Sequence, residues 1–172
     1  MTPAPTVTPL VADDSTIRTA VAAWLSDRAA AEATYGHIST WETSGVTDMS
    51  YLFCGNSYDY SGSGYCNTAA FSFNEDIGAW DTSGVTTMLS MFDGAHAFNQ
   101  DISDWAVHSV TDMNQMFADA TSFDQDLGWC VDDDVDLHLA FRYTPCASTL
   151  CGVSWGGCDI PSNGNVLSLI HI

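Results

Sequence analysis

The chain is almost without basic residues. Its 172 residues include three Lys and Arg residues against 22 Asp and Glu residues, which gives a formal net charge of -19 at pH 7. A surface of this charge repels nucleic-acid backbones and the headgroups of anionic membranes. The sequence also has no apolar run long enough to span a bilayer. We therefore expect no nucleic-acid partner and no membrane insertion.

Motifs that mark common enzyme sites are missing as well. The sequence has no Gly-x-Ser-x-Gly nucleophile motif, no glycine-rich phosphate loop and no His-Glu-x-x-His zinc motif. We therefore predict a non-catalytic protein without a cofactor.

Neither end of the chain shows a targeting signal. Residues 1–13 begin MTPAPTVTP and are predicted to be a Pro/Thr-rich linker, of the kind that joins modules in a longer extracellular chain. Residues 161–172 end in LSLIHI, an uncharged apolar string. Two interpretations of this tail remain open: a non-native addition, or a short strand that closes the last repeat.

The main feature of the chain is an internal repeat. FNEDIGAWDTSGVTTMLSMF, residues 73–92, returns 25 positions later as FNQDISDWAVHSVTDMNQMF, residues 98–117. Two further copies are recognisable from a Trp that precedes a Phe by twelve positions. The four pairs are Trp41 and Phe53, Trp80 and Phe92, Trp105 and Phe117, and Trp129 and Phe141.

Each repeat predicts a short helix and a short strand. In VTTMLSMF, the apolar residues Val85, Met88 and Phe92 recur at steps of three and four, the spacing of one helix face. The segments DIGAW and DISDW are short and have polar flanks, which is typical of brief strands. The expected N-terminal caps of the helices are Thr47, Thr86 and Thr111, with Asp48 and Asp112 in the first turn.

A unit of this size cannot bury its apolar side alone, whereas a stack of units can bury continuous columns of Trp, Met and Phe. We therefore predict an α/β solenoid of short strands and short helices. Its expected parts are an N-terminal helical cap over 14–40, three repeats over 41–128 with an insertion at 54–68, and a degenerate fourth repeat with a cysteine-rich C-terminal cap over 129–160.

With its period near 25 residues, the pattern FNQDISDWAVHSVTDMNQMF resembles the BspA-type leucine-rich-repeat proteins, a family of surface proteins of bacteria, protists and microalgae. The resemblance covers residues 35 to about 158. It implies a leucine-rich-repeat-like solenoid displayed outside the cell for adhesion or recognition, and it implies no catalytic residues. The chain departs from the bacterial pattern in its cysteines and in its longer first repeat.

Six cysteines predict disulfides and an oxidising compartment, so we expect an extracellular or cell-surface protein. Cys54 and Cys66 flank the insertion, and a bond between them would close its loop. The other four cysteines lie near the C-terminal end, where three pairings are open. A zinc site is the alternative, but the spacing has no Cys-x-x-Cys pair. The favoured pairs are Cys130–Cys146 and Cys151–Cys158.

Aspartates recur at one position of successive repeats, as Asp76, Asp101 and Asp126. Stacking would bring these like charges close together, so they need hydrogen bonds or a cation between them. We favour capping of local turns over calcium, because the Asp-x-Asp-x-Asp-Gly loop of dedicated calcium sites is absent. The best position for a weak calcium site is the run Asp132, Asp133 and Asp134.

Two groups of residues are candidates for ligand binding. Small and polar residues on the predicted strands would form a shallow polar face, and tyrosines on the insertion offer amphipathic rings suited to sugars or proteins. Local packing of these tyrosines is the open alternative. The candidates are Thr40 and Asp104 on the strands, Glu42 and Asp81 just beyond them, and Tyr58, Tyr60 and Tyr65 on the insertion.

These observations favour a non-catalytic recognition or adhesion module that binds an extracellular protein or glycan. The alternative is a structural, divalent-cation-binding component of a surface or matrix, in which the acidic residues matter more than the tyrosines. The sequence does not indicate an oligomeric state.

Overall fold

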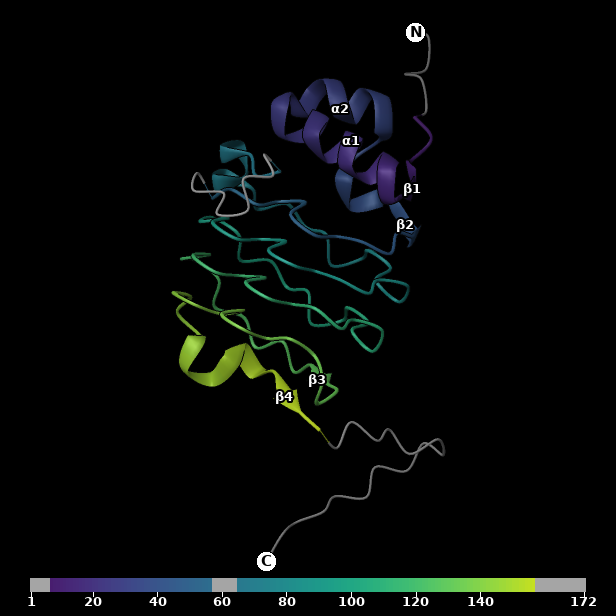
Figure 1. The fold of residues 1–172 in the computed structure, drawn as a ribbon. Coiled ribbons are helices and arrows are strands. Elements are labelled where there is room, and N and C mark those ends of the chain that lie inside the picture. The colour runs from purple at the N-terminus through teal and green to yellow at the C-terminus, as the bar shows by residue number, and fades with distance from the viewer. Residues whose placement is uncertain (1–6, 57–64, 157–172) are drawn as a thin grey trace, which may run out of the picture.

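The structure, a computed structural model, describes residues 7–56 and 65–156. Helices α1 (Asp14–Ser26) and α2 (Arg28–Tyr35) cover one end of the molecule, and irregular layers of chain follow them (Figure 1). Strand β1 (Val11–Asp13) pairs in parallel with β2 (Glu42–Gly45), and β3 (Cys130–Val131) pairs in parallel with β4 (Ser154–Trp155). The remaining elements of the described residues are the 3-10 helices η1 (Ile38–Thr40), η2 (Thr68–Ser72) and η3 (Ala147–Gly152).

Helix α1 begins at a side-chain cap. The Asp13 carboxylate accepts from the backbone N–H of Thr16, and the Thr16 hydroxyl accepts from the backbone N–H of Asp13, both at 2.8 Å. This reciprocal pair satisfies amides that the start of a helix leaves open. Asp13 also belongs to β1, so the last three residues of the predicted linker over 1–13 form a strand.

Replacing Asp13 with alanine is expected to lower the melting temperature by about 2–4 °C, the usual cost of losing an N-terminal cap in a domain of this size. Hydrogen bonds, first that from the Thr16 backbone, lower the pKa of Asp13 to about 2, so the carboxylate stays charged at neutral pH. Thermal unfolding followed by circular dichroism measures the change. Asp13→Asn keeps an acceptor oxygen and should recover most of the loss; equal losses in both variants would contradict the cap.

The predicted fold class, a leucine-rich-repeat-like α/β solenoid, is wrong. In the described residues both α-helices precede the repeats, and the sheets are two small pairs of strands outside the repeated helix and strand segments. The repeats themselves consist of turns and loops, and no helix follows the predicted caps Thr47, Thr86 and Thr111. Neighbouring repeats contact each other through isolated parallel bridges, which join Asp48 to Thr87, Thr87 to Asp112, and Asp112 to Asp136.

An alternating pattern of backbone hydrogen bonds explains why turns form here. The N–H groups of Met88, Ser90 and Phe92 donate to carbonyls of the next repeat at 2.8–2.9 Å. The intervening N–H of Met91 donates instead to the Met88 carbonyl, three residues back, at 3.2 Å. One residue at the same place in each repeat takes a left-handed conformation, which a helix cannot continue through. These residues are Tyr51, Ser90, Gln115 and Leu139, with φ between 49° and 62°.

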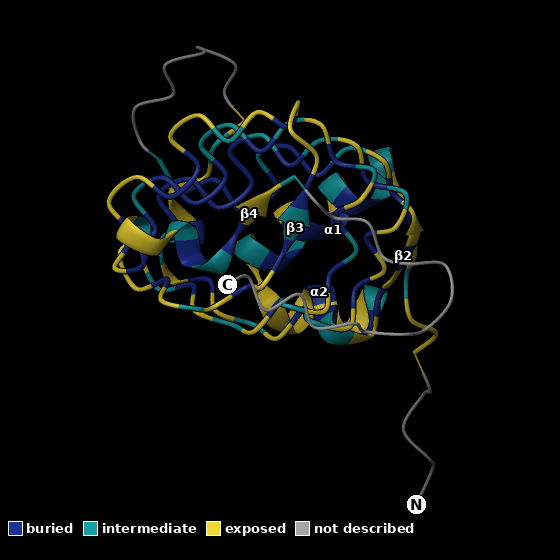
Figure 2. Ribbon diagram, turned by 90° about the horizontal axis from the view of Figure 1, so that it is seen from below, coloured by how far each residue is buried: buried dark blue, intermediate teal, exposed yellow. Residues whose placement is uncertain are grey.

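The core consists of aromatic columns that run through the repeats, and it appears as the buried interior in Figure 2. The Trp of the second, third and fourth repeats also joins its layer to the preceding one; the Trp80 indole, for example, donates to the Ile38 carbonyl at 2.9 Å. The prediction that the repeated Trp, Met and Phe residues form the core is confirmed. The ring centres lie 5.3–5.7 Å apart in the column Phe53, Phe92, Phe117 and Phe141, and 5.9–6.0 Å apart in the column Phe73, Phe98 and Phe123.

Candidate functional site: a groove beside helix α1

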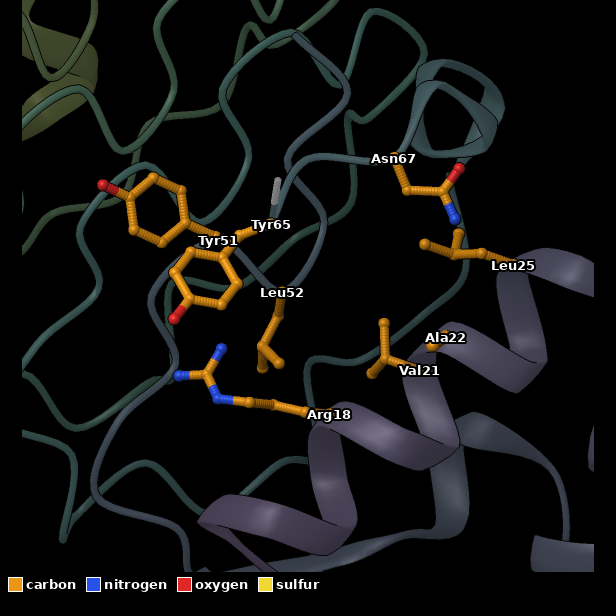
Figure 3. Close-up of a pocket in the computed structure, with 8 residues that line it drawn as sticks. All are labelled: Arg18, Val21, Ala22, Leu25, Tyr51, Leu52, Tyr65 and Asn67. Carbon is orange, nitrogen blue, oxygen red and sulfur yellow. The ribbon is translucent and has the colours of Figure 1, made fainter. Parts of the chain in front are cut away.

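A hollow that combines aromatic, apolar and charged side chains lies between α1 and the first repeat (Figure 3). It consists of two adjoining open clefts of about 110 Å³ and about 360 Å³, which share Arg18, Tyr51 and Tyr65 as lining residues. We call this hollow the α1 groove. Its other lining residues are Val21, Ala22, Leu25, Leu52 and Asn67 in the smaller cleft, and Asp48, Ser50 and Leu89 in the larger one.

Helix α1 is fixed against the first repeat by its own first turn. The Asp14 carboxylate accepts from the backbone N–H groups of Thr47 at 2.7 Å and Asp48 at 3.0 Å, and from the Thr47 hydroxyl at 2.8 Å. Burial alone would raise the pKa of Asp14, but these hydrogen bonds and the charge of Arg18 lower it below its ordinary value. The charged carboxylate therefore holds one wall of the α1 groove in place at neutral pH.

Arg18 projects from α1 across the groove and is held at three points. Its guanidinium donates to the Ser50 carbonyl at 2.7 Å and to the Asp48 carbonyl at 3.3 Å, and it forms an ion pair with the Asp48 carboxylate at 2.9 Å. Because two of these contacts are to backbone carbonyls, the backbone of the first repeat fixes the position of the guanidinium. Arg18 thus places a fixed cation on the floor of the groove in a chain that has three basic residues in all.

Two tyrosines form the aromatic wall. The rings of Tyr51 and Tyr65 stack with their centres 5.7 Å apart and their planes inclined by 29°. Tyr65 keeps 64% of its surface exposed and is followed by Cys66, which forms a disulfide with Cys54. The disulfide holds the Tyr65 backbone close to the first repeat, so the two rings stay together although one of them is mostly exposed.

The chemistry of the α1 groove suits a ligand with both flat and polar surfaces. Stacked tyrosines offer an apolar platform with hydroxyl groups at its rim, and Leu25 extends that platform along α1. The Arg18 guanidinium lies next to the two rings, and Asn67 lies on the opposite side of the smaller cleft, next to Leu25 (Figure 3). Pockets that bind sugars or peptide side chains combine these features: aromatic surface with a few polar groups that fix orientation.

Of the predicted ligand-binding residues that the structure describes, one lies in the groove. Tyr65 is part of the aromatic wall, whereas Tyr58 and Tyr60 lie outside the described residues. The predicted strand face does not contribute to the groove, because its residues are exposed elsewhere, in η1, in β2 and between the regular elements. These residues are Thr40, whose hydroxyl donates to the His37 carbonyl, Glu42, which accepts from the Ser44 N–H, Asp81, which accepts from Ser83, and Asp104.

Sequence analysis missed Arg18 and Tyr51, although a signal for Arg18 was present. Arg18, Val21, Ala22 and Leu25 follow each other at steps of three, one and three, so they share one face of α1. The only basic residue of that helix stands on this face. Tyr51 had no comparable signal, since its place beside Tyr65 depends on the left-handed backbone of the turn.

Two of the three recurring acidic residues cap turns in the structure. Asp76 accepts from the backbone N–H of Gly78 and Asp101 from that of Ser103, both at 3.0 Å, which agrees with the favoured interpretation. Asp132, Asp133 and Asp134 are exposed in the loop after β3. Within residues 7–56 and 65–156, no three His, Cys, Asp or Glu side chains come together as a metal-binding group.

The disulfides agree with the sequence prediction in part. Cys54 and Cys66 are bonded, as predicted, with Cα atoms 4.6 Å apart. The favoured pairing of the other four is wrong, because Cys146 bonds with Cys151 and not with Cys130. The turn at η3 brings these two cysteines to a Cα distance of 4.8 Å, through left-handed residues that the sequence did not reveal. Cys130 is disulfide-bonded too, and Cys158 lies outside the described residues.

Comparison with known proteins places the chain in a family. Residues 27–148, most of the chain, match the family described as "Mycoplasma protein of unknown function, DUF285". The chain belongs to the DUF285 family. The matched region runs from the start of α2 through the four repeats, so it contains Tyr51 and Tyr65 but not Arg18. No curated protein and no solved structure matches this DUF285 member. None of its helices in the described ranges is long and apolar enough to cross a bilayer.

Proposed function

We propose that this chain is a non-catalytic recognition or adhesion module that binds a protein or glycan ligand in the α1 groove. The observation that carries the proposal is the stacked pair Tyr51 and Tyr65 beside the fixed guanidinium of Arg18. An aromatic ring with most of its surface exposed is costly to leave in water, and such rings concentrate at binding sites.

The geometry favours a ligand that meets the groove with little rearrangement. Arg18 is already held by Ser50 and Asp48, and the Cys54–Cys66 disulfide already holds the chain next to Tyr65. Groups fixed before binding lose less conformational entropy when a ligand arrives. This pre-organisation supports recognition of a defined surface over non-specific contact.

The proposed setting is outside the cell. Disulfides persist in oxidising compartments, and two are formed within the described part of the chain. The resemblance of the repeat to BspA-type surface proteins supports the same setting. The high negative charge adds solubility and keeps like-charged copies apart.

The test is a screen of glycans and extracellular protein surfaces, followed by affinity measurements on variants. Tyr65→Ala is expected to weaken binding about fivefold to tenfold, because it removes half of the aromatic wall. Trp155→Ala is the control, since Trp155 is another exposed aromatic residue, with an exposed fraction of 46%, but lies in β4, outside the groove. Unchanged binding by Tyr65→Ala would refute the α1 groove as the site.

A further inference from the structure

The last repeat ends in a row of backbone donors. In the first three repeats, alternate N–H groups donate to the following repeat; in the third these are Met113, Gln115, Phe117 and Asp119. The equivalent N–H groups of the fourth repeat make no hydrogen bond within the described structure, whereas the intervening N–H of Ala140 donates to the Leu137 carbonyl at 3.0 Å. We call this row the donor edge: the N–H groups of Leu137, Leu139, Phe141 and Tyr143.

The opposite end of the same ladder is closed. The first repeat presents carbonyls there, and the Arg18 guanidinium donates hydrogen bonds to those of Asp48 and Ser50. The backbone N–H of Asn67 donates to the Cys54 carbonyl at 2.7 Å. The acceptor side of the stack is therefore covered by α1 and by the chain after the insertion, while the donor side has no backbone partner within the described residues.

The C-terminal part of the described chain covers only the beginning of the fourth repeat. Strand β4 pairs with β3, and the N–H of Gly156 donates to the Val131 carbonyl at 3.2 Å. The donor edge begins after this point, at Leu137. Backbone N–H groups in folded proteins are nearly always hydrogen-bonded when they are buried. A row of unpaired N–H groups is therefore a template for another strand.

We propose that the donor edge binds an extended, positively charged segment of a partner protein, which aligns parallel to the fourth repeat and offers alternate carbonyls to the four N–H groups. The charge follows from the flank of the edge: Asp132, Asp133, Asp134 and Asp136 are all exposed just before it. In a parallel alignment these acids face the amino-terminal half of the bound segment, so its Lys and Arg residues belong there.

The edge also offers contacts for apolar side chains of the segment. Leu139 is 37% exposed and Tyr143 is 63% exposed, and the two lie two ladder positions apart. The Arg142 guanidinium stacks on the Tyr143 ring at 4.4 Å and places a cation at the far end. An acidic residue or a free carboxylate at the carboxyl end of the segment would form an ion pair with the Arg142 guanidinium. The edge thus has a charge polarity that specifies direction.

A second copy of the chain does not fit as the occupant. Its acceptor edge is closed by Arg18 and Asn67, so it has no row of carbonyls to give. Two donor edges placed face to face would oppose N–H to N–H and would bring both aspartate runs together. With a formal charge of -19 on each chain, that contact is repulsive.

The test is amide hydrogen exchange of the full chain, measured by NMR with a synthetic peptide. The probe has two lysines at its amino end, alternating valine and threonine in its middle and a glutamate at its carboxyl end. We expect saturating peptide to slow exchange at Leu137, Leu139, Phe141 and Tyr143 by about tenfold or more, and to leave His138, Ala140 and Arg142 unchanged. Uniform protection of all seven amides, or protection of none, overturns the proposal.

Charge exchange distinguishes directed pairing from general attraction. A control peptide with the lysines replaced by glutamates should give no protection to the native chain, and it should protect the same four amides in the double variant Asp133→Lys and Asp134→Lys. Equal protection by both peptides would overturn the charge assignment.

A third arm addresses residues 157–172, which follow Gly156 directly. If the four amides are already protected without peptide, a segment of the chain covers them, and truncation after Gly156 would then expose them. That result would identify the chain's own C-terminal segment as the occupant and would overturn the proposal of a partner.

Discussion

Replacing Phe92 with alanine is expected to lower the free energy of unfolding by about 3–5 kcal/mol. Phe92 is fully buried and stands in the middle of its column, with the ring of Phe53 at 5.5 Å on one side and that of Phe117 at 5.3 Å on the other. The ring centre of Phe98, which belongs to the neighbouring column, lies 4.0 Å from that of Phe92. Removing the ring leaves a cavity that these neighbours cannot fill, because backbone hydrogen bonds between repeats fix their spacing.

Phe71→Ala is the matched control for this experiment. Phe71 is only partly buried, and it stacks on His96 at 4.6 Å near the surface. The same chemical truncation should therefore cost about 1 kcal/mol, since less apolar surface returns to water. Urea unfolding of both variants and the native chain gives the comparison. Similar losses at the two positions would mean that the columns do not carry the stability of the stack.

The periodic core could be predicted from the sequence because it depends only on spacing. A Trp that precedes a Phe by twelve residues puts the same pair at the same place in each layer, whatever backbone connects them. Trp80 and Trp105 are buried for this reason, and so are Met88 and Met113. The exposed or buried state of a repeated residue follows from the repeat, not from its secondary structure.

The backbone between those positions could not be predicted in the same way. Val85, Met88 and Phe92 have helical spacing, but a helix of eight residues is only marginally stable alone. In the structure, Met88 and Phe92 gain hydrogen bonds to the next repeat, and Ser90 takes a left-handed conformation to allow this. Contacts between layers therefore override a local pattern that favours a helix.

The candidate site shows the same limit. Tyr65 was predicted because a disulfide-closed insertion with tyrosines is a plausible binding loop. Its partner Tyr51 lies fourteen positions earlier, and only the turn geometry and the Cys54–Cys66 disulfide bring the two rings together. Arg18 comes from a different element altogether. A site assembled from a helix, a turn and an insertion has no sequence spacing of its own.

Asp93 provides a pH-dependent test of the stack. Its carboxyl group is largely buried at the base of the insertion, and this burial raises its pKa from 3.8 to about 6. The negative charge of Asp119 adds to the shift, whereas hydrogen bonds from the Asn56 amide and the charge of Arg142 oppose it. The folded state therefore binds this proton more tightly than the unfolded state does.

The sign of the effect on stability follows from linkage. Above pH 6 Asp93 is ionised in both states, and the folded protein bears the cost of a partly desolvated carboxylate. Below pH 4 it is protonated in both states, and that cost is gone. The contribution of Asp93 is thus favourable at low pH and is lost as the pH rises through about 6. Residues such as Asp81, whose pKa is lowered by the hydroxyl and backbone N–H of Ser83, act in the opposite direction at lower pH.

Asp93→Asn should therefore stabilise the protein at pH 7 by about 2 kcal/mol, less than the whole shift implies because the carboxyl group is not fully removed from water. The asparagine oxygen can still accept from the Asn56 amide, so the variant keeps the shape and one hydrogen bond of the site. The gain should disappear near pH 4, where native Asp93 is itself neutral. Urea unfolding at pH 4, 5, 6 and 7 measures this, with Asp81→Asn as a control that should show no gain at pH 7. A constant difference between Asp93→Asn and the native chain across these pH values would show that burial of the charge is not what destabilises the neutral protein.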